Sequence, residues 1–416
     1  MSKINGKVRS QERPQRLLLV HNRIYEGPDR RVVSGENVAF RTEKALLEDR
    51  GHEVLTYERD NAEVVGMSTA RTARVAAGSI WSASAYAELD ALLAQTRPEV
   101  VHVHNTVPLI SPAVYYAACK HGAAVIQTLH NYRMVCPSGL LMRDGQPCEL
   151  CVDKAVPWPG VVHACYRSSR AATTVVGTML TVHRALRTYQ RYVHVYIALT
   201  EFARRRFIRG GLHPEQVMVK PNLLKGTADP GTGEGKYALF VGRLSEEKGI
   251  RDMLTAWTHL EESCPLHILG DGPERGAVTE AARQDRRIIY RGTQPHAEVL
   301  SAMQRASFLL VPSRYYEGFP MVLTEALPTG LPVIASRLGA LRELVHDGQT
   351  GLHVRPADPR DLAEKVAHLL HNPAVLAQMR RQVRAAYEAT YTPEANYLQL
   401  MHVYSKALHL ARHHGR

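Results

Sequence analysis

The sequence predicts an α/β protein built from two consecutive doubly wound parallel sheets. Short apolar runs that end in polar residues alternate with segments of helical spacing, as buried parallel strands alternate with their crossover helices. This alternation is interrupted at residues 225–236, which are rich in Gly, Asp and Thr, and then restarts. The length of 416 residues also exceeds that of one ordinary core, so two domains are expected.

The first half of the chain begins with the apolar run RLLLVHN at residues 16–22, which is typical of a buried parallel strand. Residues 35–54 then carry apolar side chains at helical spacing, and Gly51 ends this predicted helix before the next strand. The same pattern of an apolar run with a polar end predicts three more strands, at residues 100–105, 123–131 and 195–200.

The second half repeats the pattern after the linker. Five strands are predicted within residues 237–250, 265–273, 287–293, 307–313 and 331–336. We therefore divide the chain into an N-terminal domain at residues 1–224 and a C-terminal domain at residues 225–392. Residues 393–416 have an apolar side at helical spacing, and we expect this terminal helix to pack back towards the N-terminal domain.

The composition excludes several classes of protein. A hydrophobic content of 45% with 22% charged residues is typical of a globular protein and not of a disordered one. No apolar run reaches the ~18 residues that span a bilayer. The first 16 residues are polar and basic, and the apolar run that follows is too short for a signal peptide. We therefore expect a cytoplasmic protein.

The net charge of +12 is concentrated in an arginine-rich block. Between His163 and Arg209 a single acid, Glu201, accompanies nine arginines, at positions 167, 170, 184, 187, 191, 204, 205, 206 and 209. A solvated helical face, an anionic membrane surface and a polyanionic substrate all remain open as explanations. Nucleic acid is disfavoured, because no recognition module is present.

Residues 173–191 within this block suggest peripheral membrane association at the inner face of the membrane. If Val175, Met179, Val182 and Leu186 face inward or toward acyl chains, then Arg184, Arg187 and Arg191 lie at the headgroups.

Two cations follow the first predicted strand of the second half. Arg243 and Lys248 stand in FVGRLSEEKGI, in a loop between a strand and a helix. Ligands of open α/β sheets bind at the carboxyl ends of the strands, and two cations at such a place suit a diphosphate. Taken singly, either residue could equally belong to a surface ion pair.

Two glutamates stand eight positions apart in SRYYEGFPMVLTEALPTGLPVIAS, residues 313–336. The turn after Glu317 leads into a predicted helix that carries Glu325, and amides at the helix start, around Gly318 and Phe319, favour an anion. Eight helical residues advance by ~12 Å, so the carboxylates cannot act on one sugar bond as a glycosidase pair does. The spacing indicates that they hold the two ends of an extended ligand such as a nucleotide sugar.

These motifs resemble those of the GT-B glycosyltransferases of family 4, the group 1 glycosyl transferases. The resemblance rests on VGRLSEEKG, ILGDGPER, EGFPMVLTE, GLPVIAS and TGLHV, and it runs from LLLVHN to DPRDLAEKVAHLL. It implies two Rossmann-like domains that face each other across a cleft. It also implies an enzyme that moves a sugar, with retention and without a metal cofactor, from a nucleotide-diphosphate sugar to an acceptor. We expect a glycan or lipid-linked acceptor, in the synthesis of a surface polysaccharide or glycolipid.

The resemblance also implies roles for residues of the C-terminal domain. Arg243 and Lys248 would neutralise the diphosphate and stabilise the leaving group, in place of a divalent cation. Glu317 would hold hydroxyls of the donor sugar, and Glu325 would bind the ribose. The departing phosphate would help to deprotonate the incoming hydroxyl, so most of the catalysis would be electrostatic.

Further roles fall on the cleft between the domains. The amides of Gly318 and Phe319 would lie beside sugar and phosphate, and His130 would contact the donor sugar from the N-terminal domain. Gly35 falls in the loop that lines the acceptor side. This loop reads VSGEN and not a double glycine, and His130 is followed by Asn131 where aspartate is frequent. Both departures concern the acceptor side.

Four cysteines lie within 30 residues, at positions 136, 148, 151 and 165. Cys136, Cys148, Cys151 and Cys165 are able to complete a tetrahedral S4 site, for which zinc is the natural occupant. A structural zinc site and unlinked core thiols both stay open, whereas disulfides are disfavoured in a cytoplasmic chain. Cys119 and Cys264 have apolar surroundings and are expected to be core residues.

Other functions remain open beside the transferase. A nucleotide-sugar epimerase or a glycan phosphorylase could use the same two-domain fold, and a binding protein could keep the fold without turnover. The R-x4-K pair followed by E-x7-E favours the transferase. The full set of donor-binding charges argues against a binding protein, because an idle site need not retain each charge.

Overall fold

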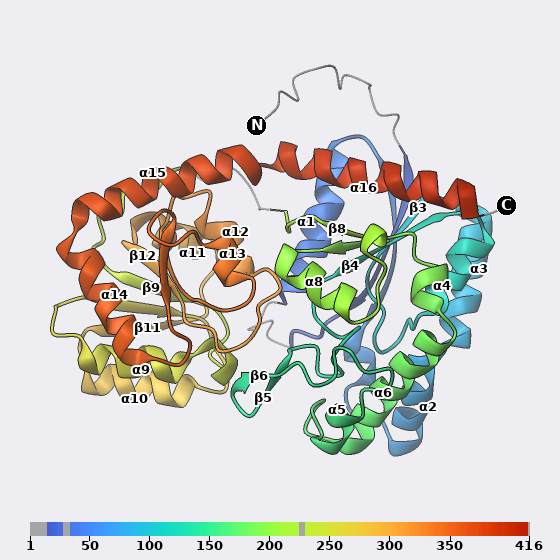
Figure 1. The fold of residues 1–416 in the computed structure, drawn as a ribbon, viewed down its shortest axis with the longest axis horizontal. Helices are drawn as coiled ribbons and strands as arrows, with labels where there is room; N and C mark the ends of the chain where they lie inside the picture. The colour runs from blue at the N-terminus through green and yellow to red at the C-terminus, as the bar shows by residue number, and fades with distance from the viewer. Residues whose placement is uncertain (1–14, 28–33, 224–228, 415–416) are drawn as a thin grey trace.

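The structure is a computed structural model that describes residues 15–27, 34–223 and 229–414. It contains two six-stranded sheets, one in each half of the chain, with helices packed around both (Figure 1). Neighbouring strands within each of these sheets pair in parallel. The predicted fold class, two doubly wound α/β domains, is therefore confirmed.

The N-terminal sheet has the strand order β2-β1-β3-β4-β7-β8. Its strands are β1 (Arg16–Arg23), β2 (Glu53–Asp60), β3 (Val100–Asn105), β4 (Ala124–Leu129), β7 (Val195–Ala198) and β8 (Val217–Val219). The central strands β3 and β4 are buried along their whole length, which explains why their apolar runs stood out in the sequence. The edge strand β8 was not predicted, because it has only three residues and one of them is exposed.

The helices of this half are α1 (Gly35–Asp49), α2 (Thr69–Ile80), α3 (Ala83–Thr96), α4 (Ala113–Lys120), α5 (Trp158–Val162), α6 (Arg170–Ala185), α7 (Thr188–Arg191) and α8 (Glu201–Arg209). Two short 3-10 turns, η1 (Asn61–Val64) and η2 (Pro214–Gln216), lie between them. A small antiparallel hairpin, β5 (Met142–Arg143) and β6 (Gln146–Pro147), lies outside the main sheet, in the long connection between β4 and α6.

The C-terminal sheet has the order β11-β10-β9-β12-β13-β14. Successive strands are added towards one edge from β9 to β11 and towards the other edge from β12 to β14, so the strand order reverses between β9 and β12. Its strands are β9 (Ala238–Val241), β10 (Leu266–Leu269), β11 (Ile288–Gly292), β12 (Phe308–Val311), β13 (Val333–Ser336) and β14 (Gly351–Val354). The other elements are η3 (Glu246–Lys248), α9 (Ile250–His259), α10 (Arg275–Gln284), α11 (His296–Arg305), α12 (Met321–Ala326), α13 (Leu341–Leu344) and α14 (Pro359–His371). The reversal point is where ligands of doubly wound folds bind.

The last two helices, α15 (Pro373–Thr390) and α16 (Pro393–His414), connect the two halves. Figure 1 shows α15 lying along the C-terminal half and α16 crossing to the N-terminal half. Leu400, Met401 and Tyr404 of α16 are buried against the N-terminal sheet in a common core with Leu17 and Ile126. The predicted domain boundary after residue 224 lies outside the described residues. No helix among the described residues is long and apolar enough to cross a bilayer.

Candidate functional site

A cleft with a volume of about 730 Å³ lies between the two halves. This volume is within the range of ordinary small-molecule sites. Seven of the eight site residues predicted outside the cysteine cluster line it, namely Gly35, His130, Arg243, Lys248, Glu317, Gly318 and Phe319. The eighth, Glu325, is not among the lining residues. The loops after β9 and β12 supply the C-terminal wall, in agreement with the reversal point of that sheet.

Two glycines allow the walls of the cleft to approach each other closely. A Cβ atom on Gly318 would stand 3.0 Å from the backbone oxygen of His130, in the opposite half. A Cβ atom on Gly35 would stand 2.9 Å from Cγ of Met321. A side chain at position 318 would press on the backbone of the opposite half, so Gly318 is needed for this closeness, whereas the flexible Met321 side chain is able to move away from a side chain at position 35.

The carboxylate of Glu317 lies at the centre of a buried cluster of donors. Lys248 Nζ donates to Glu317 Oε1 across 2.7 Å, and Ser313 Oγ donates to the same oxygen across 2.7 Å. Tyr315 Oη donates to Glu317 Oε2 across 2.6 Å. Both carboxylate oxygens are therefore occupied and the side chain is held in one orientation. Only 4% of Glu317 is exposed, so these bonds compensate the cost of burying the charge.

The charges of this cluster stabilise one another. Burial alone would lower the pKa of Lys248, but the Glu317 carboxylate and the Tyr315 hydroxyl raise it above its ordinary value. Burial raises the pKa of Tyr315, and the carboxylate raises it further. Lys248 is thus an ammonium and Tyr315 a neutral hydroxyl at neutral pH.

Arg243 differs from Lys248 in its surroundings. Its side chain is exposed and lines the cleft from the loop after β9. Within the described part of the chain it makes no hydrogen bond and no ion pair. A guanidinium in this state is able to bind a phosphate in a bidentate manner without first breaking an internal bond.

The helix predicted from MVLTEAL is confirmed, but the amides of Gly318 and Phe319 lie before its start. The helix α12 begins at Met321, after Pro320, and has only six residues. Pro320 adopts an extended backbone conformation, which places the helix start after it. Gly318 and Phe319 therefore belong to the loop that precedes the helix.

The eight-residue spacing of the two glutamates is also only partly helical, because Glu317 lies in the same loop. Glu325 lies in α12, where its Oε1 is 3.1 Å from His296 Nε2 of α11. Its role at a ribose stays a prediction.

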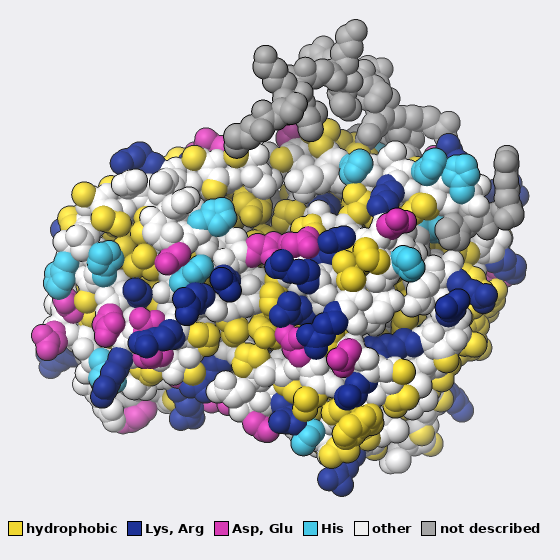
Figure 2. All heavy atoms as spheres, viewed as in Figure 1, with side chains coloured by type: hydrophobic (Ala, Val, Ile, Leu, Met, Phe, Trp, Pro, Cys, Tyr) yellow, Lys and Arg dark blue, Asp and Glu magenta, His cyan; other side chains and the backbone are white. Residues whose placement is uncertain are grey.

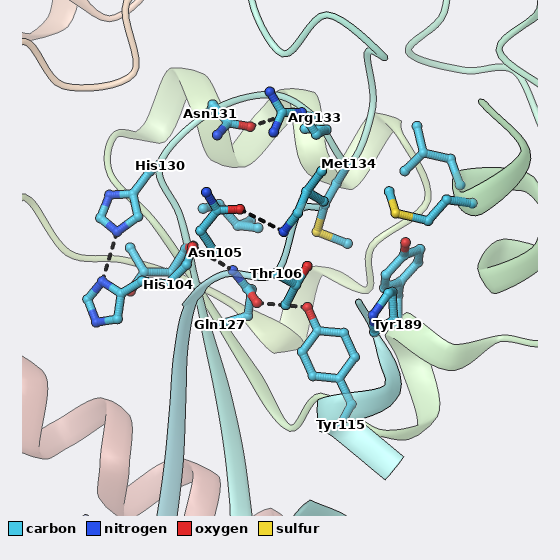
Figure 3. A pocket seen from close by; sticks show the side chains of 16 residues that line it. His104, Asn105, Thr106, Tyr115, Gln127, His130, Asn131, Arg133, Met134 and Tyr189 are labelled. Carbon is cyan, nitrogen blue, oxygen red and sulfur yellow. Dashed lines mark hydrogen bonds between the residues drawn. The ribbon is translucent and has the colours of Figure 1, made fainter. Parts of the chain in front are cut away.

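A chain of buried polar side chains lies behind the N-terminal wall of the cleft. His130 Nε2 is 2.9 Å from His104 Nδ1, and the two rings stack (Figure 3). His104 Nε2 is in turn 3.3 Å from Glu43 Oε1, whose other oxygen accepts a hydrogen bond of 3.0 Å from Lys220. A carboxylate beside Nε2 of His104 favours the proton on that nitrogen, so Nδ1 accepts and His130 Nε2 donates.

His130, His102 and His21 are neutral at neutral pH. Burial and the neighbouring His104 and His21 rings hold the pKa of His130 well below its usual range. Burial lowers the pKa of His102 to about 4 and that of His21 to about 3. Burial alone would raise the pKa of Glu43, but Lys220 and His102 hold it well below the ordinary value. The charged partners in this region are thus Glu43 and Lys220.

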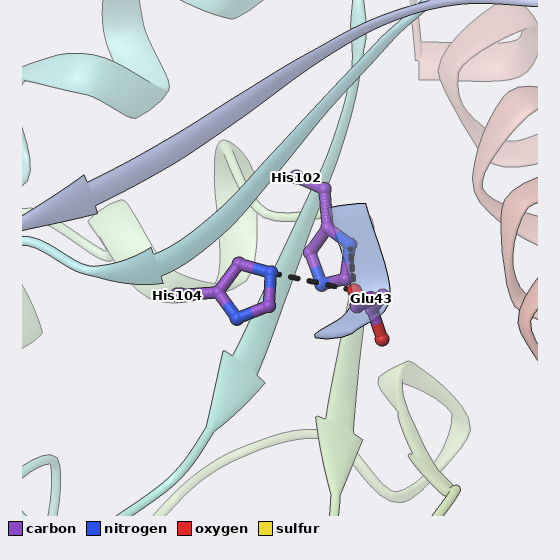
Figure 4. A group of neighbouring side chains, drawn as sticks. All are labelled: Glu43, His102 and His104. Carbon is purple, nitrogen blue, oxygen red and sulfur yellow. Dashed lines mark ion pairs between the residues drawn. The ribbon is translucent and has the colours of Figure 1, made fainter. Parts of the chain in front are cut away.

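Among the described residues, one group of three potential metal-binding side chains has its ligand atoms within 4.8 Å of one another. It consists of Glu43, His102 and His104 (Figure 4). Three such atoms are a usual basis for a metal site. However, all three side chains are buried, and Lys220 already supplies a positive charge 3.0 Å from Glu43. We interpret the group as a structural ion network that supports His130.

Several side chains of the cleft were not predicted from the sequence. Glu36 is half-buried on the N-terminal wall and accepts hydrogen bonds from Asn131 Nδ2 (2.6 Å) and Asn105 Nδ2 (3.3 Å). Burial raises its pKa, and the bond from Asn131 offsets this only in part. The available signal was its position directly after Gly35. Tyr315 was also missed, although it stands only two residues before Glu317.

The four clustered cysteines line one small cavity of about 10 Å³, and none of them is in a disulfide. Cys136 and Cys151 are buried, and Cys148 and Cys165 are partly exposed. Of the two cysteines expected in the core, Cys264 is buried and Cys119 is partly exposed.

The arginine block differs from its predicted arrangement. Arg184 does not reach a surface for headgroups, because its guanidinium donates to the backbone oxygens of Lys154 and Met134, both at 2.7 Å. Arg187 and Arg191 are exposed, as the membrane hypothesis requires. Met179 is buried, whereas 55% of Leu186 is exposed. Leu186 follows the last residue of α6, so it lies beyond the end of the buried stripe of this helix.

Known proteins resemble both halves of the chain. The glycosyl transferase 4-like domain matches residues 34–223, and the glycosyl transferases group 1 model matches residues 235–372. Over 163 residues the chain is 36% identical to the glycogen synthase of Mycobacterium tuberculosis, which covers 37% of this chain and 38% of that protein. Over 176 residues it is 34% identical to the phosphatidyl-myo-inositol mannosyltransferase of Mycobacterium leprae, which covers 41% of this chain and 46% of that protein. These matches span less than half of each relative.

Solved structures resemble nearly the whole chain. The sucrose-phosphate synthase of Thermosynechococcus elongatus has a TM-score of 0.68 at 19% identity, over 94% of this chain and 99% of that one. Alr3699/HepE of Anabaena, crystallised with UDP and glucose, has a TM-score of 0.63 at 16% identity, over the same shares. At these identities the likeness concerns the fold. With both halves matched by family models and the whole chain by this fold, the protein belongs to the group 1 glycosyl transferases and has the GT-B fold.

Proposed function

We propose that the protein transfers a sugar from a nucleoside-diphosphate sugar to a hydroxyl group of a glycan or a lipid-linked acceptor, with retention of configuration. The observation that carries this proposal is the composition of the cleft wall. One cavity presents the guanidinium of Arg243, which has no partner among the described residues, together with the ammonium of Lys248 and the buried carboxylate of Glu317. Cations suit the diphosphate, and Glu317 Oε2, which within the described part of the chain accepts only from Tyr315, keeps one acceptor position for a sugar hydroxyl. The UDP bound by Alr3699/HepE supports a donor of this class.

In the proposed reaction the bond between the sugar C1 and the phosphate oxygen breaks, and its electron pair leaves with the diphosphate. Arg243 and Lys248 stabilise this developing negative charge. The acceptor oxygen forms the new bond to C1, and its proton passes to the departing phosphate. Glu317 is assigned to positioning and not to nucleophilic attack, because three donors already occupy its oxygens.

The experiment that tests this proposal is a thermal-shift screen of nucleoside-diphosphate sugars, followed by an assay for nucleotide release. A transferase releases nucleoside diphosphate in proportion to added acceptor, and the configuration of the product at C1 is read by NMR. An epimerase would convert the donor without an acceptor, and a phosphorylase would require inorganic phosphate. A binding protein would shift in melting temperature and release nothing. Each of these three results would replace the proposal.

We further propose that the N-terminal half docks reversibly on an anionic membrane, so that the activity serves surface polysaccharide or glycolipid synthesis at the cytoplasmic face. Figure 2 shows hydrophobic side chains gathered over α5, at the end of this half, with Lys and Arg side chains nearby. Trp158 is 56% exposed, and Val156 and Val162 are also exposed. The adjoining helices carry exposed arginines, among them Arg71 on α2 and Arg170 on α6. Apolar anchors with a basic rim suit a membrane interface.

Liposome co-sedimentation tests this docking. Binding should require anionic lipid, weaken at high salt and fall strongly in Trp158→Ser. Leu398→Ser is the matched control, because Leu398 is 51% exposed on α16, far from α5 in the fold. Equal loss in both variants, or no binding in any condition, would contradict membrane docking and leave the transferase proposal untouched.

A further inference from the structure

We infer that Cys136, Cys148, Cys151 and Cys165 bind one zinc ion, which braces the long connection between β4 and α6. The four residues come from separate parts of this connection, yet their side chains line one cavity of about 10 Å³. A cavity of this size is no larger than one water molecule needs, and it suits a single ion. Four cysteine side chains around one small cavity are typical of a structural zinc site.

The local structure brings these cysteines together. Cys136 N donates to Tyr132 O in the turn that follows β4, and Cys148 directly follows the hairpin strand β6. Cys151 lies in the next turn, and Cys165 N donates to Gly160 O after α5. Gly160 allows close packing there, because a Cβ atom on it would stand 3.0 Å from Pro137 Cγ.

The sulfurs are more widely spaced than in a closed site. Among the described residues no three of these sulfurs have mutual distances within 4.8 Å. In a tetrahedral site with Zn–S bonds of about 2.3 Å, the sulfurs are about 3.8 Å apart. Rotation of the cysteine side chains about χ1 moves the sulfurs without moving the backbone. Only weak contacts oppose the rotation, such as those of Cys136 Sγ with Ser138 Oγ (3.2 Å) and of Cys151 Sγ with Pro157 O (3.8 Å).

The connection has little regular structure to hold its outer part in place, beside the hydrogen bond from Arg184 to Lys154 O and the ion pairs of Glu149 with Arg206 and Arg209. Its regular structure consists of two strands of two residues each and the five-residue helix α5. Val135, Leu141 and Val152 anchor its inner side in the N-terminal core. The hairpin and the turns beyond it have no comparable core, and a metal ion is a usual substitute for one.

This brace reaches the cleft. A Cβ atom on Gly145, at the tip of the hairpin, would stand 3.0 Å from Glu246 Oε1 of η3. The turn η3 ends at Lys248, so the hairpin touches the element that carries this cation. Gly139 and Leu140, which precede the hairpin, line the cleft themselves. Loss of the ion would therefore loosen one wall of the cleft as well as the N-terminal half.

Metal analysis of the purified full-length protein tests the inference. We expect close to one zinc per chain, and release of this zinc when the thiols are titrated with a mercurial in the presence of a chromogenic chelator. Replacement by cobalt should produce the absorption bands of tetrahedral cobalt with thiolate ligands. A protein with four freely titratable thiols, no bound zinc after zinc is added back and no such bands would overturn the inference.

Variants separate this site from an ordinary core. Cys151→Ser should lower the zinc content severalfold and lower the melting temperature. Cys119→Ser is the matched control, because Cys119 lies outside the cluster and should leave the zinc content unchanged. If Cys151→Ser does not fold, the mercurial titration of the unmodified protein gives the same answer. Full zinc content in a folded Cys151→Ser protein would contradict the assignment.

Discussion

The ammonium of Lys248 donates a hydrogen bond of 2.7 Å to Glu317 Oε1, and so joins two groups that the sequence analysis assigned to different parts of the donor. The bond orients both side chains before any ligand binds, since Ser313 and Tyr315 hold the same carboxylate. Arg243 takes no part in this cluster. The two cations of the cleft are therefore unequal, one built into the protein and the other available to the ligand.

This inequality predicts different effects of removing the two cations. Lys248→Met should abolish measurable turnover and also destabilise the fold by about 3 kcal/mol, because it leaves a buried carboxylate without its ion-pair partner. Arg243→Met should lower turnover by two or more orders of magnitude with an unchanged melting temperature, because this side chain is exposed and unpaired among the described residues. Nucleotide-release assays and thermal unfolding measure the two quantities.

The double variant Lys248→Met with Glu317→Leu provides the control for stability. Removing both charges should recover part of the lost stability, because no uncompensated charge remains buried. An Arg243→Met protein with normal turnover would remove Arg243 from the mechanism, and a fully stable Lys248→Met protein would show that the cluster does not depend on the ion pair.

Turnover is expected to continue when excess EDTA is added, because Arg243 and Lys248 supply the positive charge that a divalent cation would otherwise supply. Initial rates in the first minutes after addition measure this. An immediate loss that magnesium or manganese restores would show a metal-dependent transferase. A slow decline over hours that follows zinc release would instead report on the cysteine cluster.

The stability of the protein should fall as the pH drops below about 6.5. The ordinary histidine pKa is 6.5, and it is lowered to about 4 in His102 and about 3 in His21. Between these values the unfolded chain binds more protons than the folded one, so stability decreases with falling pH. Each histidine removes up to about 1.4 kcal/mol per pH unit. Glu43, whose pKa is depressed, loses its contribution only below about pH 4.5.

Chemical denaturation at a series of pH values from 7 to 5 measures this slope. The slope of stability against pH reflects the number of protons taken up on unfolding. His102→Gln should lower this number by about one, whereas substitution of the exposed His402 on α16 should leave it unchanged. A stability that is constant over this range would show that these histidines are not buried as neutral groups.

The contact between α13 and α8 should stabilise the arrangement of the two halves. Glu343 of α13 accepts hydrogen bonds of 2.8 Å from the backbone nitrogens of Glu201 and Phe202, at the start of α8. A carboxylate at this position stabilises a helix start, so Glu343→Ala should cost about 1 kcal/mol. The KM for the donor should rise more than kcat falls. Without this contact the two walls of the cleft are no longer held at a fixed distance and orientation, so the donor binds less tightly.

Unfolding curves and donor kinetics check this expectation, with Arg342→Ala as the control, since its side chain is exposed on the same helix. The free energy of unfolding of Glu343→Gln should lie between that of Glu343→Ala and that of the unmodified protein. Identical stability of the unmodified protein and Glu343→Ala would show that the contact contributes nothing measurable.

Glu36 should affect the acceptor more than the donor. Its carboxylate lies on the N-terminal wall, where the side-chain amides of Asn131 and Asn105 donate to it. Glu36→Gln should raise the KM for the acceptor by about tenfold, the effect of losing one charge-assisted hydrogen bond. Donor binding, measured by thermal shift, should stay within twofold. If only donor binding changed and the KM for the acceptor did not, Glu36 would be assigned to donor binding instead.

Many features of the fold could be predicted because local sequence determines them. Buried parallel strands such as β3, β4 and β12 must be apolar throughout, so their runs are visible without a structure. Edge strands escape this rule, which is why β8 was missed. The positions of Arg243 and Lys248 between the strand β9 and the helix α9 also follow from local sequence.

What the sequence alone determined is therefore the succession of strands and helices and the identity of the charged groups in the loops after them. Only the tertiary structure decided which of these groups meet. Glu36 and Asn131 are 95 positions apart, Lys220 and Glu43 are 177 apart, and Glu343 and Glu201 are 142 apart. Periodicity and turn chemistry act over a few residues, whereas these pairs form because two sheets and their loops pack in one arrangement. The cleft is the product of that packing.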